Sequence, residues 1–222
     1  MAAPAPAPSV AAVGPTEAYA VVGNHFCVPY ETVLIMKEKM FSLSGKADIR
    51  DSQGNLMFRL QGNAFSVSKQ KTFFDPNDKP VCTLTSKVFS LHNTTYLCTG
   101  DSTDTNGALL MAKKNILSFT PVLNVFLKGN TSDNPDIVLQ GSFIHHQFDI
   151  STSKGVKLAR VERELFSAQE LLGSQSYAIR IMPNVDMALI LGLVTMADDI
   201  FVDAKHHHHH HHHHGVRVGV GI

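Results

Sequence analysis

Short segments in which hydrophobic and polar residues alternate run through most of this chain, and one long apolar segment follows them. Residues 64–68 (Ala-Phe-Ser-Val-Ser) alternate at period two, which is typical of a half-buried strand. Residues 32–42 give a longer, apolar-rich strand candidate. Segments of this kind predict about a dozen strands, at 32–42, 46–50, 55–60, 64–68, 72–74, 81–85, 88–91, 95–99, 108–113, 122–127, 137–143, 147–151, 158–162 and 177–182.

Two of the predicted turns look like copies of one unit. Residues 51–60 align with residues 75–84, so that the two segments lie 24 residues apart and each begins with Asp. An Asp side chain can accept hydrogen bonds from the backbone that follows it, which favours a tight turn. We interpret the match as a repeated strand–turn–strand unit. The alternative is that any two hairpins would share such residues.

The long apolar segment lies between Asn184 and Ile200, and from Met187 to Ala197 only Thr195 interrupts it. A helix that is apolar on all sides must be enclosed by protein or by lipid. This helix would be roughly 20–25 Å long, too short for a hydrocarbon core of about 30 Å. We therefore predict a mainly β fold, in which a closed barrel of about a dozen strands surrounds a buried C-terminal helix.

Three regions differ in composition. Residues 1–23 are rich in Pro and Ala and are predicted to be a disordered leader. Residues 24–205 carry the predicted strands and helix and are expected to form one domain. Residues 206–222 are a low-complexity tail, which is either native or an affinity tag with further residues after it. Its nine consecutive histidines chelate Ni²⁺, Cu²⁺ or Zn²⁺ only non-specifically: His206, His207, His208, His209, His210, His211, His212, His213 and His214.

Charge and cysteine content exclude several classes of function. Nineteen basic side chains balance nineteen acidic ones, whereas nucleic-acid binders usually show a basic excess. Nucleic acid is therefore not expected as a direct ligand. The three cysteines form no Cys-x-x-Cys pair, so we expect small buried thiols rather than a disulfide framework or a zinc site. The N-terminus lacks a signal peptide pattern, so secretion is not expected. We expect a monomer in the cytoplasm, with a peripheral position at a membrane or a place in the nucleus as alternatives.

The chain resembles the plant LURP-one-related proteins, which belong to the tubby C-terminal-like superfamily together with the phospholipid scramblases. The resemblance covers roughly residues 25–203, and its motifs stand at 28–37, 51–56, 74–81, 184–186 and 197–199. Their order and spacing make the match specific. It implies a twelve-stranded barrel closed around a hydrophobic C-terminal helix, in agreement with the pattern above.

The resemblance also implies a function at membranes. Tubby relatives bind phosphoinositide headgroups and are described as membrane-tethered regulators of transcription, scramblases act at bilayers, and some LURP-one-related proteins are linked to plant defence. No lipid-contacting residue of tubby can be matched to a position of this chain. The expected function is a non-enzymatic module without a cofactor, which binds anionic phospholipid or phosphoinositide and relays a signal through protein partners.

Few side chains form a recognisable site. No nucleophile elbow, phosphate loop or dinucleotide fingerprint occurs in the sequence. The adjacent pair His145 and His146 would point to opposite faces of a strand, so one imidazole is expected in the core and one in solvent. Three short basic pairs are candidates for contact with lipid phosphate, although such pairs are more often an ordinary solvated face: Lys37 with Lys39, Lys69 with Lys71, and Lys113 with Lys114.

Three hypotheses follow, each with an observation that favours it. A basic surface patch in the folded chain would favour the phospholipid-binding module. An open cavity beside the helix would favour a scaffold that binds protein or a small ligand without a lipid role. An enzyme or lipid transporter would need clustered catalytic side chains, and the sequence contains no such cluster.

Overall fold

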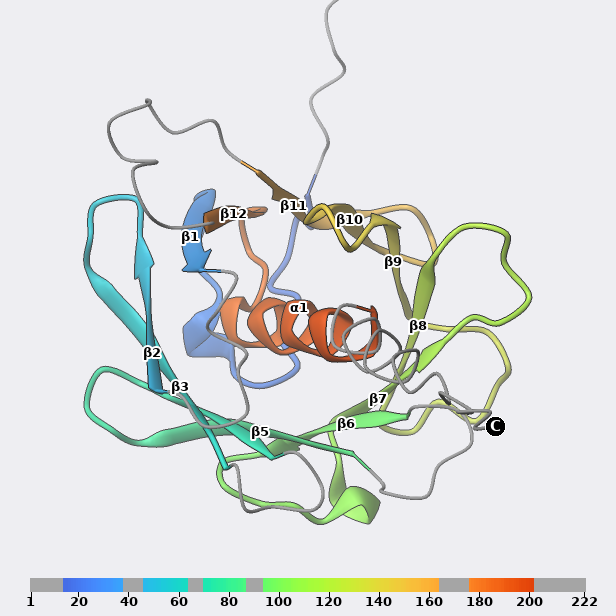
Figure 1. The fold of residues 1–222 in the computed structure, drawn as a ribbon, viewed down its shortest axis with the longest axis horizontal. Coiled ribbons are helices and arrows are strands. Elements are labelled where there is room, and N and C mark those ends of the chain that lie inside the picture. Colours follow the sequence, from blue (N-terminus) through green and yellow to red (C-terminus); the bar gives the residue numbers. More distant parts are fainter. Residues whose placement is uncertain (1–13, 38–45, 64–69, 87–93, 164–175, 202–222) are drawn as a thin grey trace, which may run out of the picture.

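The computed structural model describes residues 14–37, 46–63, 70–86, 94–163 and 176–201. Within these ranges twelve antiparallel strands form a closed barrel, in which each strand pairs with its sequence neighbours and β1 pairs with β12. Helix α1 (Met187–Phe201) lies at the centre of the ring of strands (Figure 1). The strands are β1 (Thr32–Lys37), β2 (Lys46–Asp51), β3 (Leu56–Gly62), β4 (Lys71–Phe74), β5 (Pro80–Ser86), β6 (Thr95–Thr99), β7 (Leu110–Lys114), β8 (Val122–Leu127), β9 (Ile137–Ser142), β10 (Gln147–Thr152), β11 (Lys157–Glu162) and β12 (Ser176–Ile181).

The predicted fold class is confirmed, and the reason is visible in the alternation of side chains. On β9, Ile137 and Leu139 are fully buried while Val138 between them is only partly buried. The same period of two places Phe148 and Ile150 of β10 on the inner face. The predicted strands at 64–68 and 88–91, and the part of the first strand beyond residue 37, lie outside the described residues.

Helix α1 fills the barrel and forms its core. Every residue of the helix except Asp199 is buried. Gly192 permits a close approach to the wall, because a Cβ atom at that position would lie 3.0 Å from a methyl group of Leu97 on β6. The one polar side chain in the middle of the helix, Thr195, donates its hydroxyl to the carbonyl of Leu191 at 2.9 Å. Within the described ranges, no helix combines the length and the apolar content that a membrane crossing requires.

A buried carboxylate joins the start of the helix to the N-terminal segment. Asp186 is 0% exposed, and its Oδ1 accepts hydrogen bonds from the backbone N–H groups of Ala188 (3.0 Å) and Leu189 (3.1 Å). Its Oδ2 accepts three more at 2.7–3.1 Å, from the backbone of residues 21–23. Asp186 is thus the N-cap of α1 and also an anchor for a distant segment.

The predicted boundary of the leader at residue 23 needs correction. Tyr19 pairs with Val185 in an isolated parallel bridge, and its N–H donates to the carbonyl of Asn184 at 2.8 Å. Tyr19, Val21 and Val22 pack against the core. Composition alone marked this segment as a leader, but its backbone donors find acceptors beside the start of the helix. The structured part of the chain therefore includes residues 14–23.

The two aligned hairpins share one hydrogen-bond pattern, which confirms the repeated unit. Asp51 Oδ1 accepts from the backbone N–H of Gln53 and of Asn55, both at 2.9 Å. Asp75 Oδ1 accepts from the residues at the same two offsets, at 2.8 and 2.9 Å. A positive φ also recurs at equivalent positions, 85° at Gly54 and 61° at Asp78.

The up-and-down topology gives the barrel two mouths with different loops. Strands β1, β3, β5, β7, β9 and β11 all end at the mouth where helix α1 ends. We call this the helix-exit mouth; among the described residues it includes the loop at 115–121 and the turn at 143–146. The opposite mouth holds the start of the helix, the N-terminal segment and the two Asp turns.

Candidate functional site

The helix-exit mouth carries an exposed apolar loop. Residues 115–121 connect β7 to β8, and we call them the apolar loop. Leu117 is 88% exposed, and Ile116 and Phe119 are also strongly exposed. The loop has internal order, because Asn115 Oδ1 accepts the N–H of Leu117 at 3.0 Å. Exposed large apolar side chains that stand together usually mark a surface that meets a partner or a membrane.

An open pocket lies between the apolar loop and the end of the helix. Its volume is about 710 Å³, within the range of ligand-binding cavities. Ile200 and Phe201, the last residues of the helix, line it together with Phe143 and Ile144 of the β9–β10 turn. The rings of Phe143 and Phe201 are stacked with centroids 4.2 Å apart. The cavity beside the helix that would favour a ligand-binding role is therefore present.

One lysine, Lys114, stands next to this apolar surface, whereas its neighbour Lys113 lies on the outer face of β7 beside Phe126 of β8. The ammonium group of Lys114 lies 5.3 Å from the ring centre of Phe201, and that of Lys113 lies 5.4 Å from the ring centre of Phe126. Within the described residues neither ammonium group is in an ion pair with a carboxylate. Both charges can therefore meet an external anion without first breaking a salt bridge.

The structure separates the other lysine candidates. Lys71 is only 3% exposed and is paired with Asp199 of the helix, so its assignment as a surface lipid contact is wrong. The Asp199 side chain is only 12% exposed, and a carboxylate so far removed from water is stabilised by a paired cation. Lys37 is the last residue of β1 and stands at the helix-exit mouth. Lys39 and Lys69 lie outside the described residues.

Among the described residues, the opposite mouth carries more carboxylates than lysines, unlike the helix-exit mouth. Its described loops include Lys79, Lys128 and Lys154, but carboxylates are more numerous there. At the helix-exit mouth the two helix carboxylates are buried or paired, and Lys46, Lys113 and Lys114 are exposed or partly exposed. The described part of the barrel is thus polarised along its axis. Besides Glu17 of the N-terminal segment and the buried Asp186, the described carboxylates of the opposite mouth are Glu31, Asp51, Asp75, Asp78, Asp101, Asp104, Asp133 and Asp136.

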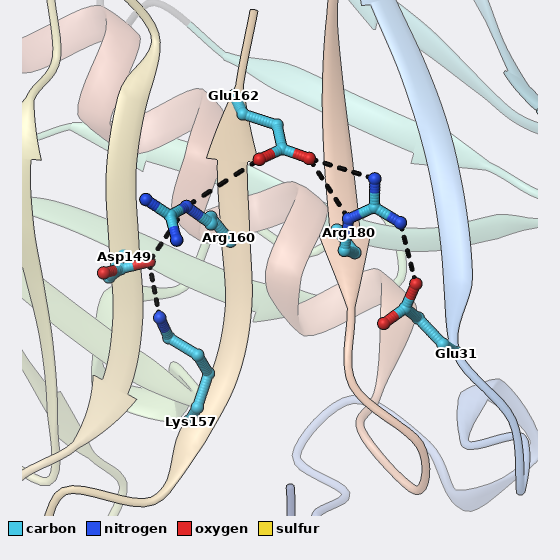
Figure 2. Close-up of polar contacts among 6 residues, drawn as sticks. All are labelled: Glu31, Asp149, Lys157, Arg160, Glu162 and Arg180. Carbon is cyan, nitrogen blue, oxygen red and sulfur yellow. Dashed lines mark hydrogen bonds and ion pairs between the residues drawn. The ribbon is translucent and has the colours of Figure 1, made fainter. Parts of the chain in front are cut away.

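The outer wall of the barrel carries charges that are already neutralised. Figure 2 shows a chain of alternating charges across β10, β11, β12 and the residue before β1. Arg180 contacts Glu31 at 2.8 Å and Glu162 at 3.0 Å, which raises the pKa of the guanidinium. Because each cation in this row of charges faces a carboxylate, the wall attracts an anionic ligand less than the helix-exit mouth does. The remaining members are Arg160, Asp149 and Lys157.

A buried polar cluster holds the end of the helix beneath the pocket. Asp198 Oδ2 accepts a hydrogen bond from the Tyr177 hydroxyl at 3.0 Å, and its Oδ1 lies 3.4 Å from Nε2 of His146. The His146 ring also stacks on Tyr177 at 4.2 Å. Burial raises the pKa of Asp198, although its interactions with His146 act in the opposite direction. Burial and the neighbouring Asp198 raise the pKa of Tyr177.

The histidine pair behaves differently from the expectation for a strand. His145 and His146 lie in the turn between β9 and β10, where His146 has a φ of 50°. His145 is exposed and His146 is buried, as expected, but a turn rather than strand alternation separates them. No acidic partner of His146 is visible at ligand spacing in the sequence, because Asp198 reaches it only in the closed barrel.

A metal site in the described part of the chain would need several ligand side chains close together. No group of three or more His, Cys, Asp or Glu side chains is arranged there to hold a metal ion. The cysteines among these residues are free thiols, with Cys82 and Cys98 buried and Cys27 half-buried. The histidine run at 206–214 lies outside the described residues.

Sequence reasoning missed the apolar loop and its pocket. The segment Asn115-Ile-Leu-Ser-Phe-Thr-Pro121 reads as an ordinary connection between two strands. The sequence feature that indicates this loop is the presence of three large apolar side chains in a connection too short to bury them. The pocket had no signal of its own, since its walls come from β7, β9 and α1, which are distant in the sequence.

Comparisons with known proteins agree with the architecture. A family model described as LURP-one-related matches residues 32–198. Protein LURP-one-related 10 of Arabidopsis thaliana is 31% identical over 186 residues, covering 82% of this chain and 96% of that protein. Protein LURP-one-related 15 of the same plant is 29% identical over 184 residues, covering 81% of this chain and 85% of that protein.

A solved structure extends this similarity to the fold. The X-ray structure of an Arabidopsis thaliana protein superposes with a TM-score of 0.64 at 25% sequence identity. The match covers 82% of this chain and 98% of the other. Because the family model spans the barrel from the start of β1 to Asp198 in the last turn of the helix, the chain belongs to the LURP-one-related family.

Proposed function

We propose that this chain is a non-enzymatic module that docks on anionic phospholipid surfaces through its helix-exit mouth. The single observation that carries the proposal is the apolar loop, whose Leu117 and Phe119 project into solvent next to Lys114, with Lys113 one residue earlier on β7. Apolar side chains flanked by cations are the combination that a peripheral protein needs at a bilayer interface.

Charge supports this orientation. A negatively charged leaflet attracts each Lys near its surface by about 1 kcal/mol, and it repels carboxylates. The acidic loops of the opposite mouth would therefore face away from the membrane, while the lysines of the helix-exit mouth face it. The paired wall shown in Figure 2 would lie beside the bilayer, since its charges already neutralise one another.

The energetics favour insertion of the loop rather than of the helix. Helix α1 is enclosed by the strands, and removing it would open the core. The loop residues Ile116, Leu117 and Phe119 are already exposed in water, so their transfer to an acyl environment requires no unfolding. Full burial of one such side chain is worth about 1.5–3 kcal/mol, which makes a three-residue anchor sufficient for reversible binding.

A signalling role completes the proposal. The resemblance to tubby-like regulators and to defence-linked plant proteins suggests that docking positions the chain for protein partners near the membrane. The acidic opposite mouth is the surface left accessible when the helix-exit mouth is docked. The alternative is a scaffold that binds protein or a small ligand without a lipid role, for which the pocket is the supporting observation.

Vesicle co-sedimentation of the full chain tests the proposal. Neutral phosphatidylcholine vesicles are compared with vesicles that also contain phosphatidylserine or a phosphoinositide. A pH of about 8 keeps the histidine run uncharged. We expect saturable binding to anionic vesicles, and a loss of at least about tenfold in affinity in the double variant Leu117→Ser/Phe119→Ser.

Matched lysine variants distinguish vesicle binding through the helix-exit mouth from binding through positive charge anywhere on the surface. The double variant Lys113→Ser/Lys114→Ser should lose roughly 30-fold in affinity for anionic vesicles, from two charges near the surface. The double variant Lys79→Ser/Lys128→Ser removes the same charge from the opposite mouth and should bind as the unaltered chain does. Equal losses in both double variants, or no binding to any vesicle, would contradict the proposal and favour the scaffold.

A further inference from the structure

We propose that the pocket at the helix-exit mouth is a binding site for a single acyl chain of an anionic phospholipid. The inference rests on the proposed function, because it names the lipid group that the docked mouth would take up. Its basis is the pocket of about 710 Å³ between the apolar loop and the last turn of α1.

The inner surface of the pocket suits a hydrocarbon chain. Phe143, Ile200 and Phe201 are nearly fully buried and form its base. Phe119 and Ile144 extend the apolar lining toward solvent. A polyhydroxylated headgroup would leave this base without a partner, whereas each methylene placed against it adds roughly a factor of four in affinity.

The rim of the pocket suits the phosphate of the same lipid. Among the lining residues that the structure describes, Lys114 is the only cation, and none is Asp or Glu. The ammonium group lies 5.3 Å from the centre of the Phe201 ring, so the charge stands directly beside the apolar base. Amide and hydroxyl side chains complete the rim, from Asn115, Ser118, Thr120, Gln140 and Ser142. One positive charge above an apolar base is complementary to a negatively charged amphiphile.

The buried cluster below the pocket keeps this base in place. Asp198 and Asp199 precede the two helix residues that form the base, and they are held by Tyr177 and Lys71. The pocket is therefore built on a fixed end of the helix and not on a frayed terminus. A preformed apolar site of this kind loses little affinity to ordering when a chain enters.

Binding of monomeric lipids to the full chain tests the inference. The probes are lysophosphatidic acid below its critical micelle concentration, lysophosphatidylcholine with the same chain, and glycerol 3-phosphate without a chain. Titration calorimetry should rank lysophosphatidic acid first, by at least about tenfold over glycerol 3-phosphate because of the chain. Lysophosphatidylcholine should bind roughly fivefold more weakly than lysophosphatidic acid, because of its neutral headgroup.

A pocket-filling variant locates the site. Gln140→Trp places an indole in the pocket from the side of β9, and it should lower the affinity for lysophosphatidic acid at least about tenfold. Lys128→Trp, at the opposite mouth, is the matched control and should leave the affinity unchanged. Far-ultraviolet circular dichroism of both variants shows whether the barrel is intact; if Gln140→Trp does not fold, Lys114→Ser replaces it, with an expected loss of roughly fivefold.

The outcomes distinguish this inference from the proposed function. Vesicle binding without monomer binding would overturn the acyl site and leave the docking surface intact. Monomer binding without vesicle binding would support the site and overturn the docking role. Equal affinity for lysophosphatidic acid and glycerol 3-phosphate would overturn the inference, since the phosphate alone would then account for binding.

Discussion

Replacement of Asp186 by Ala should remove the most heavily used side-chain acceptor at the start of the helix. The carboxylate is fully buried and accepts five backbone N–H groups, two from the first turn of α1 and three from residues 21–23. In Asp186→Ala the two donors of the first turn lose this acceptor within the core. The three donors of the N-terminal segment are only partly buried, so water can replace part of what they lose.

The size of the effect follows from these contacts. A buried donor left without its acceptor costs about 1–3 kcal/mol, and the two N–H groups of Ala188 and Leu189 contribute most of the loss. Adding a smaller cost for the N-terminal segment, we expect Asp186→Ala to lower the free energy of unfolding by about 4 kcal/mol. That is a large share of the roughly 5–15 kcal/mol typical of a folded domain.

Urea unfolding followed by circular dichroism measures this loss. Asp51→Ala is the matched control, because Asp51 also accepts two backbone N–H groups but does so in an exposed turn. Its expected cost is about 1 kcal/mol or less. Equal destabilisation by Asp186→Ala and Asp51→Ala would contradict the reasoning, because the buried Asp186 carboxylate would then stabilise the start of the helix no more than an exposed turn residue does. Amide exchange at residues 21–23 should accelerate in Asp186→Ala and stay unchanged in the control.

Four further outcomes follow from the described structure. Leu191→Asp places a carboxylate on the fully buried face of α1 and should abolish soluble folding; a soluble variant with native circular dichroism would contradict the core assignment. Gly141→Ala should cost several-fold more stability in urea than Gly155→Ala, because both have positive φ but only at Gly141 would a Cβ lie 2.6 Å from the carbonyl oxygen of Gln147. Burial raises the pKa of Asp198, which lies beside His146, Tyr177 and Lys71, so ionisation of this carboxyl group opposes folding. The stabilisation that the protonated carboxyl group contributes is full below the ordinary carboxyl range, and it is lost as pH rises through the folded-state pKa. Asp198→Asn should therefore gain stability relative to the unaltered chain between about pH 4 and pH 7, whereas a constant difference over that range would contradict the assignment. Native thiol labelling should modify Cys27 before Cys82, because burial strongly raises the pKa of Cys82 and excludes the reagent; equal rates would contradict this.

The sequence predicts the barrel well because its signals are local. Period-two alternation marks individual strands, and the apolar segment from Met187 to Ala197 can only be a helix in a protein core when it is too short for a bilayer. Asp51 and Asp75 indicate turns because they bond to their own neighbouring backbone. Each of these signals needs only nearby residues, so none depends on knowing how the strands pair.

The candidate site is harder to predict because its parts meet only after closure of the barrel. Lys71 reads as half of a surface pair, but strand β4 carries it to Asp199 near the far end of the chain. His146 finds its carboxylate in the last turns of α1, and neighbouring residues in the sequence do not indicate it. The position of Lys114 above Phe201 likewise depends on where the helix ends inside the barrel.

A single tryptophan at the apolar loop tests the central claim most directly. The chain contains no Trp, so Phe119→Trp provides one reporter in the loop and Tyr30→Trp provides one at the opposite mouth, where Tyr30 is 63% exposed. Fluorescence is measured with anionic vesicles whose acyl chains carry bromine, which quenches an indole that enters the bilayer. The account predicts a blue shift and quenching for Phe119→Trp, and an unchanged spectrum for Tyr30→Trp. Vesicle binding without quenching of Phe119→Trp, or quenching of Tyr30→Trp, would contradict docking through the helix-exit mouth.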